Sequence, residues 1–311
     1  MKHEVTNVAV LGAGVIGASW TALFACAGLR VNVYDPVAAA EHSVRAYVAE
    51  AAPMLQQLGM NTNQGEINFY TSASEAVQGC QFVQECAPEQ LDIKHQLYGQ
   101  IEGYLLPHAI VASSASGLMV TEMQQGWSDP SRFILGHPFT PPHLIPLVEL
   151  VANDKTAAGV LASAEAFYKQ VGKVTIRVNR EVPAHVANRL QAALWKEAIH
   201  LVATGVASVE DVDKAVWAGP GLRWAAMGPH MLFNLGAGEG GMEEFCRRYT
   251  DSFERWWDDL GDVQLDAATI AKLVTGVQHE AGDKPLAELA GERDALIVNM
   301  LNTSRAIRDE G

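Results

Sequence analysis

The sequence predicts a protein of the α/β class, in which a doubly wound sheet is followed by an all-helical second domain. A glycine-rich turn joins the first predicted strand to the first predicted helix, and strands and helices then alternate as far as residue 178. From Pro183 onward the apolar periodicity is helical only. We therefore expect two domains, residues 1–182 and residues 183–311, because 311 residues are enough for two cores.

The glycine-rich turn stands in the setting of a dinucleotide-binding motif, between a β-rich run at 5–11 and a helical stretch at 18–28. A second strand, 31–34, is closed by Asp35. Such a Rossmann-type turn presents free backbone amides to a pyrophosphate. Asp35 would accept hydrogen bonds from the ribose hydroxyls and repel a 2′-phosphate, so the sequence predicts NAD and not NADP. A glycine-rich turn in another kind of α/β protein is the alternative. The residues of the turn expected at the cofactor are Gly12, Ala13, Gly14, Val15, Ile16 and Gly17.

The rest of the first domain continues the alternation and brings serines to the end of a strand. The strand at 109–113 leads into the segment Ser113-Ser114-Ala115-Ser116-Gly117. In such sheets, ligands bind at the carboxyl ends of the strands. The alternative is a turn in which Ser116 caps the next helix. The other helices and strands expected here are 38–59, 67–71, 81–86, 155–171 and 173–178.

Residues 133–151 contain two short apolar runs joined by a polar link that is rich in proline. The prolines exclude a regular helix, so the two runs are expected to be buried strands. His137 and Glu149 stand near the two ends of the link and can meet only if these strands lie side by side. A histidine with a carboxylate partner can act as a general base. Taken alone, this stretch favours the simpler interpretation of a surface histidine and an unrelated acid.

The second domain is expected to be a series of helices. An apolar stripe predicts a long helix that ends near Gly205, and Ser208 with Asp211 forms a capping box that opens the next helix. Five of the seven tryptophans lie in this domain, at Trp195, Trp217, Trp224, Trp256 and Trp257. Ordinary packing in a core or a dimer interface is the expected role of most of them.

Composition excludes several classes of function. Acidic residues number 36 against 22 basic ones, and the net charge of −14 makes nucleic acid or an anionic membrane a poor partner. The four cysteines show no metal-ligand spacing, so we expect reduced thiols and no metal site. No signal peptide or membrane helix is expected, which predicts a cytoplasmic protein.

Several motifs in one order resemble the 3-hydroxyacyl-CoA dehydrogenase superfamily over essentially the whole chain, and within it the branch that acts on short substrates. They are GAGVIG, Asp35, APE with Lys94, SSASG, GHPF…LVELV and VPAHVANRL. The resemblance implies that the family's catalytic histidine is His137, its paired glutamate Glu149, its serine Ser116 and its asparagine Asn188. It also implies cofactor contacts at Ala87, Pro88, Glu89, Lys94, Ser114 and Ser116. One departure is Thr140, where the family often has asparagine.

The chemistry expected of these residues is the oxidation of a secondary alcohol. NAD accepts the hydride, and His137 accepts the hydroxyl proton while Glu149 holds its other ring nitrogen. Ser116 and Asn188 are neutral hydrogen-bonding groups suited to orienting the alcohol or carbonyl oxygen.

Two features of the second domain bear on the substrate. Arg223 could clamp a free carboxylate in place of a CoA thioester, although a salt bridge is the alternative. Clustered aromatic residues, among them the neighbouring Trp224, could hold a trimethylammonium group by cation–π contacts. A short L-3-hydroxy acid is therefore expected, with carnitine first, gulonate second and a short 3-hydroxyacyl-CoA third.

Three further expectations complete the prediction. A decarboxylating β-hydroxyacid dehydrogenase would leave the His137–Glu149 pair unexplained. A non-catalytic, crystallin-like protein that binds NAD would not need His137, Glu149, Ser116 and Asn188 together. The resemblance also implies a homodimer formed through the second domain.

Overall fold

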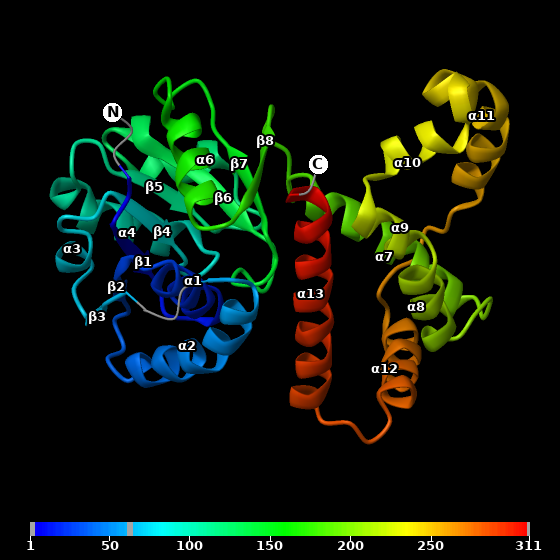
Figure 1. Ribbon diagram of the computed structural model, residues 1–311, viewed down its shortest axis with the longest axis horizontal. Helices are drawn as coiled ribbons and strands as arrows, with labels where there is room; N and C mark the ends of the chain where they lie inside the picture. Colours follow the sequence, from blue (N-terminus) through cyan, green and yellow to red (C-terminus); the bar gives the residue numbers. More distant parts are fainter. Residues whose placement is uncertain (1–3, 61–64, 310–311) are drawn as a thin grey trace. The chain divides into compact units, whose positions relative to one another are not determined.

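The computed structural model describes residues 4–60 and 65–309 of the chain (Figure 1). It divides into two compact units, one of residues 1–187 with 293–311 and the other of residues 188–292. The predicted boundary after residue 182 stays a prediction, since the division by contacts falls a few residues later and returns the last segment to the first unit.

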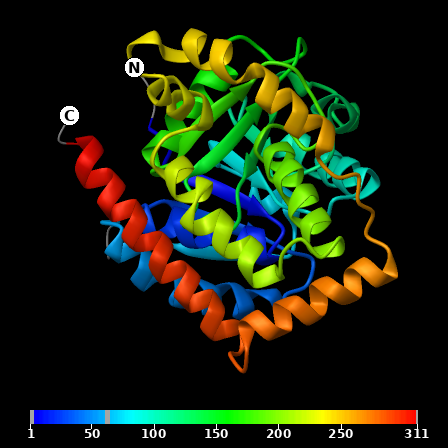
Figure 2. The ribbon, with the colours of Figure 1, turned by 90° about the vertical axis from the view of Figure 1, so that its right-hand side faces the viewer.

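Packing explains why the end of the chain belongs to the first unit. Val298 shares a small buried cluster with Leu58 and Leu144. The side chains of Asn302 and Arg305 donate hydrogen bonds to the carbonyls of Gln57 (3.1 Å) and Leu58 (2.7 Å). These contacts tie the end of the red helix α13 (Leu286–Asp309) to the end of the blue helix α2 (Ala40–Gln57) (Figure 2).

The first unit is built on one sheet in the order β3-β2-β1-β4-β5-β6-β7-β8, with eight strands in the described residues. All neighbouring strands are parallel except β6 and β7, which are antiparallel. The order reverses between β1 and β4, and a crevice for ligands forms at such a switch point. The strands are β1 (Asn7–Leu11), β2 (Arg30–Tyr34), β3 (Ile67–Tyr70), β4 (Phe82–Glu85), β5 (Ile110–Ser113), β6 (Phe133–Pro138), β7 (Leu147–Val151) and β8 (Val174–Val178).

Helices cover both faces of this sheet, so the predicted doubly wound α/β architecture is confirmed. One core cluster contains Trp20, Val48 and Phe167. The other, on the opposite face, contains Tyr98 and Met123. The longer helices involved are α1 (Val15–Cys26), α2, α4 (Leu91–Ile101) and α6 (Val160–Gln170), and the short ones are α3 (Ala73–Ala76), α5 (Val120–Met123), η1 (Glu102–Tyr104), η2 (Gln124–Gly126) and η3 (Pro130–Arg132).

The second unit is helical in its described residues, which confirms the all-helical prediction. Ser208 caps α8 as expected, because its hydroxyl oxygen accepts a hydrogen bond from the Asp211 amide at 3.0 Å. Its elements are α7 (Ala187–Ala203), α8 (Val209–Ala218), α9 (Pro220–Ala226), α10 (Pro229–Gly236), η4 (Gly238–Gly240), α11 (Gly241–Asp259), α12 (Ala267–Ala281) and the start of α13. Among all the helices described, none has the length and apolar character that a membrane crossing requires.

The turn after β1 has the geometry that its glycines predict. Gly12 has a φ of +105°, and a Cβ there would lie 2.6 Å from the Cys86 carbonyl oxygen. A Cβ at Gly17 would lie 1.8 Å from the Gly12 carbonyl oxygen, whereas a Cβ at Gly14 would meet no heavy atom within 4 Å. Gly12 and Gly17 are therefore required by the protein's own packing, and the space at Gly14 is open.

This contrast predicts different consequences for two alanine substitutions. Gly17→Ala should lower the free energy of unfolding by about 1–3 kcal/mol, because the new methyl group overlaps backbone. Gly14→Ala should leave the free energy of unfolding unchanged but weaken NAD binding by about tenfold or more, because the methyl group occupies the space open to a pyrophosphate. Urea denaturation and NAD titration measure the two effects. Equal destabilisation by both substitutions would contradict the prediction.

Candidate active site

A cleft of about 480 Å³ lies in the first unit at the carboxyl ends of β1, β2 and β4. It brings together four residues predicted to contact the cofactor, Gly12, Asp35, Ala87 and Pro88. Sequence reasoning did not single out Tyr34, Pro36, Ile93, Gln96, Leu97 and Gln100, which also line the cleft. The signal for them was position: Tyr34 and Pro36 lie at the end of β2, and the other four lie along α4.

The cleft has the features that a dinucleotide requires. One oxygen of Asp35 accepts a hydrogen bond from the Ala13 amide at 3.0 Å and the other from the Val37 amide at 2.9 Å. The carboxylate is thus fixed beside the glycine turn. The first turn of α1 has no side-chain cap and the space at Gly14 is open, so its amides are available to a phosphate. These residues fit a bound NAD.

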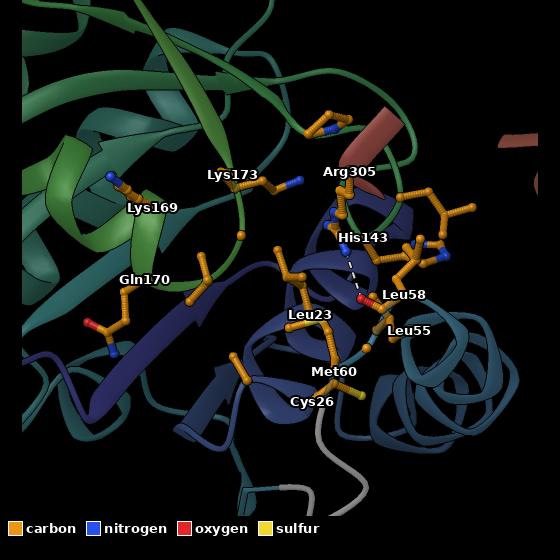
Figure 3. A pocket seen from close by; sticks show the side chains of 16 residues that line it. Leu23, Cys26, Leu55, Leu58, Met60, His143, Lys169, Gln170, Lys173 and Arg305 are labelled. Carbon is orange, nitrogen blue, oxygen red and sulfur yellow. Dashed lines mark hydrogen bonds between the residues drawn. The ribbon is translucent and has the colours of Figure 1, made fainter. Parts of the chain in front are cut away.

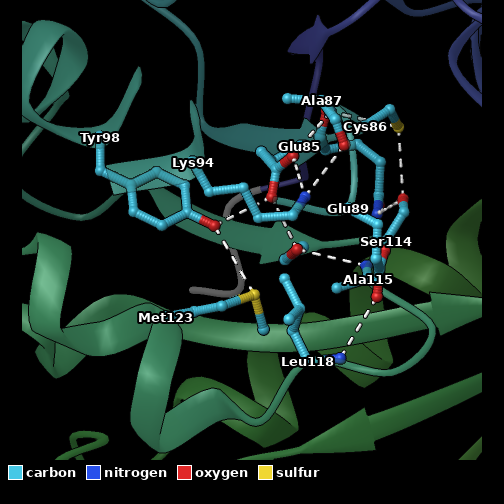
Figure 4. Close-up of polar contacts among 12 residues, drawn as sticks. Glu85, Cys86, Ala87, Glu89, Lys94, Tyr98, Ser114, Ala115, Leu118 and Met123 are labelled. Atoms are coloured by element: carbon cyan, nitrogen blue, oxygen red, sulfur yellow. Dashed lines mark hydrogen bonds and ion pairs between the residues drawn. The ribbon is translucent and has the colours of Figure 1, made fainter. Parts of the chain in front are cut away.

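A buried carboxylate, Glu85 at the end of β4, organises the neighbouring loops (Figure 4). One of its oxygens accepts hydrogen bonds from the Lys94 ammonium (2.7 Å) and the Ala87 amide (2.6 Å). The other accepts from the hydroxyls of Tyr98 (2.9 Å) and Ser113 (2.6 Å). Burial and the nearby Glu85 raise the pKa of Tyr98, so its phenol stays a neutral donor. This cluster links β4, β5 and α4 below the cofactor cleft.

The same cluster changes how Lys94 is understood. Its side chain is 1% exposed, and its ammonium also donates to the Ala87 carbonyl oxygen at 3.0 Å. Lys94 therefore stabilises the loop that carries Ala87 and Pro88, and its direct contact with the cofactor stays a prediction. Glu85 was missed because a single acid within an apolar strand gives no sign of its partners.

Glu89 positions the serine-rich turn after β5. One carboxylate oxygen accepts hydrogen bonds from the amides of Ser116 (2.9 Å), Gly117 (2.7 Å) and Leu118 (3.2 Å). The Ser114 hydroxyl oxygen accepts from the Gln84 side chain at 2.8 Å. Ser114 and Ser116 are thus held at the edge where the sequence predicts a ligand.

His137 and Glu149 meet directly. They are paired residues in the antiparallel ladder of β6 and β7, and the Nδ1 of His137 lies 2.8 Å from a carboxylate oxygen of Glu149. The other oxygen of Glu149 accepts hydrogen bonds from the amides of Val186 and Ala187, each at 2.9 Å. Burial alone would raise the pKa of Glu149, but hydrogen bonds from His137, Ala187 and Val186 hold it below its usual value.

The ionised Glu149 determines the tautomer of His137. A carboxylate can only accept, so the Nδ1 of His137 must carry a proton. In the neutral ring Nε2 is then unprotonated and able to accept a proton from a ligand. With His137 4% exposed and Glu149 fully buried, this arrangement is isolated from solvent.

The link between β6 and β7 is held by more than its prolines. The amide of His143 donates to the Ser19 hydroxyl oxygen at 2.9 Å. The ammonium of the buried Lys173 donates to the carbonyls of Pro142 and Ile145, the latter at 2.7 Å, and lies 5.0 Å from the centre of the Trp20 ring. Burial lowers the pKa of Lys173 to about 7. Sequence reasoning missed this lysine.

A separate cavity of about 500 Å³ lies next to this link (Figure 3). His143, Lys173 and Arg305 contribute polar groups to its wall, and Leu23 and Leu58 contribute apolar ones. It shares no lining residue with the cofactor cleft. It therefore forms no part of the candidate active site.

A second buried imidazole, His185, lies beside His137. Their ring centroids are 5.2 Å apart, and His185 is 1% exposed. From the sequence, this residue is expected only within the segment that opens the second domain. His185 lies in the first unit because the segment that carries it folds back toward Glu149.

Three predicted substrate residues lie in the second unit and are not tested by the geometry described above. Asn188 is its first residue, and Arg223 and Trp224 lie on α9. Thr140 is exposed in the link after β6. The roles of these residues stay predictions.

Residues 7–182 match the NAD binding domain of 3-hydroxyacyl-CoA dehydrogenase, and residues 185–270 match its C-terminal domain. The chain belongs to the 3-hydroxyacyl-CoA dehydrogenase family. It is 42% identical over 310 residues to the L-carnitine dehydrogenase of Streptomyces coelicolor, covering 99% of this chain and 98% of that protein. It is 38% identical over 308 residues to the L-carnitine dehydrogenase of a Pseudomonas species, with coverage of 97% and 96%.

Solved structures agree with this family. The NAD⁺-dependent dismutase 5-formyl-3-hydroxy-2-methylpyridine 4-carboxylic acid 5-dehydrogenase gives a TM-score of 0.82 at 28% identity, covering 97% of this chain and 99% of that one. The (S)-3-hydroxybutyryl-CoA dehydrogenase of Ralstonia eutropha gives 0.63 at 26% identity, covering 90% and 95%. This member of the family is thus a dehydrogenase, and NAD is its cofactor.

Replacing the carboxylate of Glu149 by an amide should disable His137. In Glu149→Gln the carbonyl oxygen can still accept from the backbone amides, but the NH₂ group then faces Nδ1 and favours the tautomer with a proton on Nε2. We expect turnover to fall by about 100-fold or more and the free energy of unfolding to fall by about 1–3 kcal/mol.

Steady-state kinetics and urea denaturation check this expectation. Glu165→Gln is a matched control, because Glu165 pairs with Arg177 at the surface. Wild-type turnover in Glu149→Gln would exclude the assigned tautomer.

The Glu85–Lys94 pair predicts strong coupling. Glu85→Gln and Lys94→Met should each lower the free energy of unfolding by about 3 kcal/mol or more, because each leaves a buried group without its partner. The double variant should lose clearly less than the sum of the two. Urea denaturation of the wild type, the two single variants and the double variant gives the four free energies of unfolding that a double-mutant cycle requires. Additive losses of free energy would show that Glu85 and Lys94 are not coupled.

Proposed function

We propose that this dehydrogenase oxidises the 3-hydroxyl of a short L-3-hydroxy acid to the 3-keto acid, with L-carnitine as the favoured substrate. The observation that carries the proposal is the buried His137–Glu149 pair, whose geometry leaves one ring nitrogen free to accept a proton. Two relatives of nearly full coverage are L-carnitine dehydrogenases, which supports carnitine over the alternatives.

In the proposed mechanism, His137 accepts the proton of the substrate hydroxyl at Nε2. Glu149 then stabilises the imidazolium through the hydrogen bond to Nδ1. Bound NAD supplies the acceptor for the hydride. Ser116 and Asn188 are proposed to orient the reacting oxygen.

The proposed cofactor residues surround the turn after β1 and the ends of neighbouring strands. Asp35 is proposed to bind the ribose hydroxyls, and its charge favours NAD over NADP. Lys94 is proposed to stabilise the loop that carries Ala87 and Pro88 and also to contact the cofactor. The remaining residues of the proposed set are Gly12, Ala13, Gly14, Val15, Ile16, Gly17, Ala87, Pro88, Glu89, Ser114 and Ser116.

The second unit is proposed to recognise the rest of the substrate. Arg223 would bind the carboxylate, and Trp224 would contribute an aromatic face to a trimethylammonium group. Gulonate and a short 3-hydroxyacyl-CoA are weaker candidates, since the relatives named above act on carnitine. A non-catalytic role is disfavoured by the retained His137–Glu149 pair.

We also infer a homodimer formed through the second domain, and a cytoplasmic location. Large aromatic side chains of that domain are exposed in the single chain, as Trp195 at 55%, Trp217 at 66% and Trp257 at 63%. Such surface is typical of an interface. The four cysteines are free thiols, which agrees with a reducing compartment.

A panel of substrates tests the proposed function. Purified enzyme with NAD is assayed for reduced cofactor with L-carnitine, D-carnitine, L-gulonate, L-3-hydroxybutyrate and 3-hydroxybutyryl-CoA. L-Carnitine should give a kcat/KM at least about tenfold above the others. L-Gulonate, L-3-hydroxybutyrate and 3-hydroxybutyryl-CoA lack the cation, and D-carnitine has the opposite configuration at the carbon that carries the hydroxyl.

His137→Asn is the control for the panel, since it should lose turnover and keep its affinity for NAD. A higher kcat/KM for gulonate or for the thioester would replace carnitine by that substrate. No turnover on any of the five would reject the proposed function.

A further inference from the structure

His185 lies next to His137, but the mechanism proposed above gives it no role. It lies in the first unit, 1% exposed, with its ring centroid 5.2 Å from that of His137 and the two ring planes tilted by 51°. Both nitrogens of the ring are buried. The Ala115 carbonyl is close enough to act on the pKa of the ring, yet neither nitrogen makes a hydrogen bond of normal geometry within the described residues.

The backbone at His185 adopts an unusual conformation that leads directly to the amides that bind Glu149. Ala184 and His185 have φ values of +62° and +52°, a conformation that L-residues rarely adopt. This turn is followed at once by the two amides that hold Glu149, from Val186 and Ala187. Strain of this kind persists where the surrounding structure fixes it, commonly at an active site.

The turn does not account for the imidazole. Glycine or asparagine would adopt these φ values at lower cost, and neither would place a ring against His137. An apolar ring would fill the space without the penalty of burying two polar nitrogens that lack partners. The imidazole therefore has a hydrogen-bonding capacity that no described residue uses.

We propose that His185 donates a hydrogen bond to the carboxylate of the 3-hydroxy acid whose hydroxyl is deprotonated by His137. This inference rests on the proposed function. In a 3-hydroxy acid only one carbon separates the hydroxyl-bearing carbon from the carboxylate. Two imidazoles that lie side by side can therefore reach both groups of one small ligand.

Electrostatics agree with this role. Burial, and then the adjacent His137, lower the pKa of His185, whereas Glu149, Ala115 and Glu89 oppose the shift. A neutral imidazole still donates from one nitrogen, and it adds no second positive charge beside the imidazolium that forms on His137. A carboxylate has two oxygens, so a contact with His185 is compatible with the clamp proposed for Arg223.

The test compares three variants of the full-length enzyme. His185→Phe removes the donor and keeps an aromatic ring, His185→Asn keeps a donor and tolerates positive φ, and Ala184→Gly relaxes the turn and keeps the imidazole. Kinetics with L-carnitine and with its methyl ester separate contacts to the carboxylate from other effects. Calorimetric titration of NAD, and of L-carnitine into the enzyme–NADH complex, measures binding without turnover.

We expect His185→Phe to raise KM and the calorimetric Kd for the free acid by about 10- to 100-fold. The ester should be affected far less, and the affinity for NAD should not change. His185→Asn should recover part of the loss. Ala184→Gly should keep the wild-type KM.

Four results would overturn the proposal. An unchanged KM in His185→Phe would assign the imidazole to an ordered water only. Equal effects on acid and ester would show that the carboxylate is not the partner. A weaker affinity for NAD would place the contact on the cofactor, and an effect of Ala184→Gly as large as that of His185→Phe would assign it to the backbone.

Different results would reject the proposed function and the proposed role of His185. If wild-type enzyme oxidises none of the panel acids, the proposed function is rejected. The calorimetric comparison of wild type with His185→Phe still decides whether the ring binds the acid.

Discussion

The candidate site depends on the three hydrogen bonds that Glu149 accepts. A carboxylate with no exposure to water is unstable unless its oxygens are matched by donors. The His137 ring and the amides of Val186 and Ala187 supply them. The same three bonds fix the orientation of the His137 ring, connect β6 to β7 through their side chains and hold the point at which the chain enters α7.

Two other glutamates follow the same principle at the neighbouring strand ends. Glu85 accepts four hydrogen bonds between β4, β5 and α4, and Glu89 accepts three amides of the serine-rich turn. Loops at the edge of a parallel sheet have unpaired amides, which a carboxylate can satisfy in groups. Acidic residues thus fix the loops on which the cofactor and the alcohol are expected to bind.

The sequence predicts best those features that depend on neighbours along the chain. Gly12 and Gly17 are recognisable because a tight turn between strand and helix leaves no room for a side chain. The two apolar runs and their proline-rich link predict the two strands of residues 133–151, but the pairing of His137 with Glu149 is predicted only with the family resemblance. The limits of β2 and the cap of α8 are similarly local.

What the sequence does not predict are the partners of buried polar groups. Nothing near Lys173 indicates that its ammonium binds carbonyls about thirty residues earlier, and Lys94 is directed at Glu85 by the packing of α4. The return of Arg305 to the carbonyl of Leu58 likewise requires the folded chain. Such contacts are set by distances in space and leave no periodic pattern in the sequence.

His185 illustrates how a buried polar group that the sequence does not predict can bear on function. Its role cannot be read from the motif around it, because the segment would open a helix equally well with an apolar residue at that position. Only the fold places its ring against His137 and leaves its nitrogens buried. The groups that hold the His137 ring and Glu149 all lie within residues 133–187, inside the first unit. The proposed role of His185 thus rests on its place in the fold and not on a sequence motif.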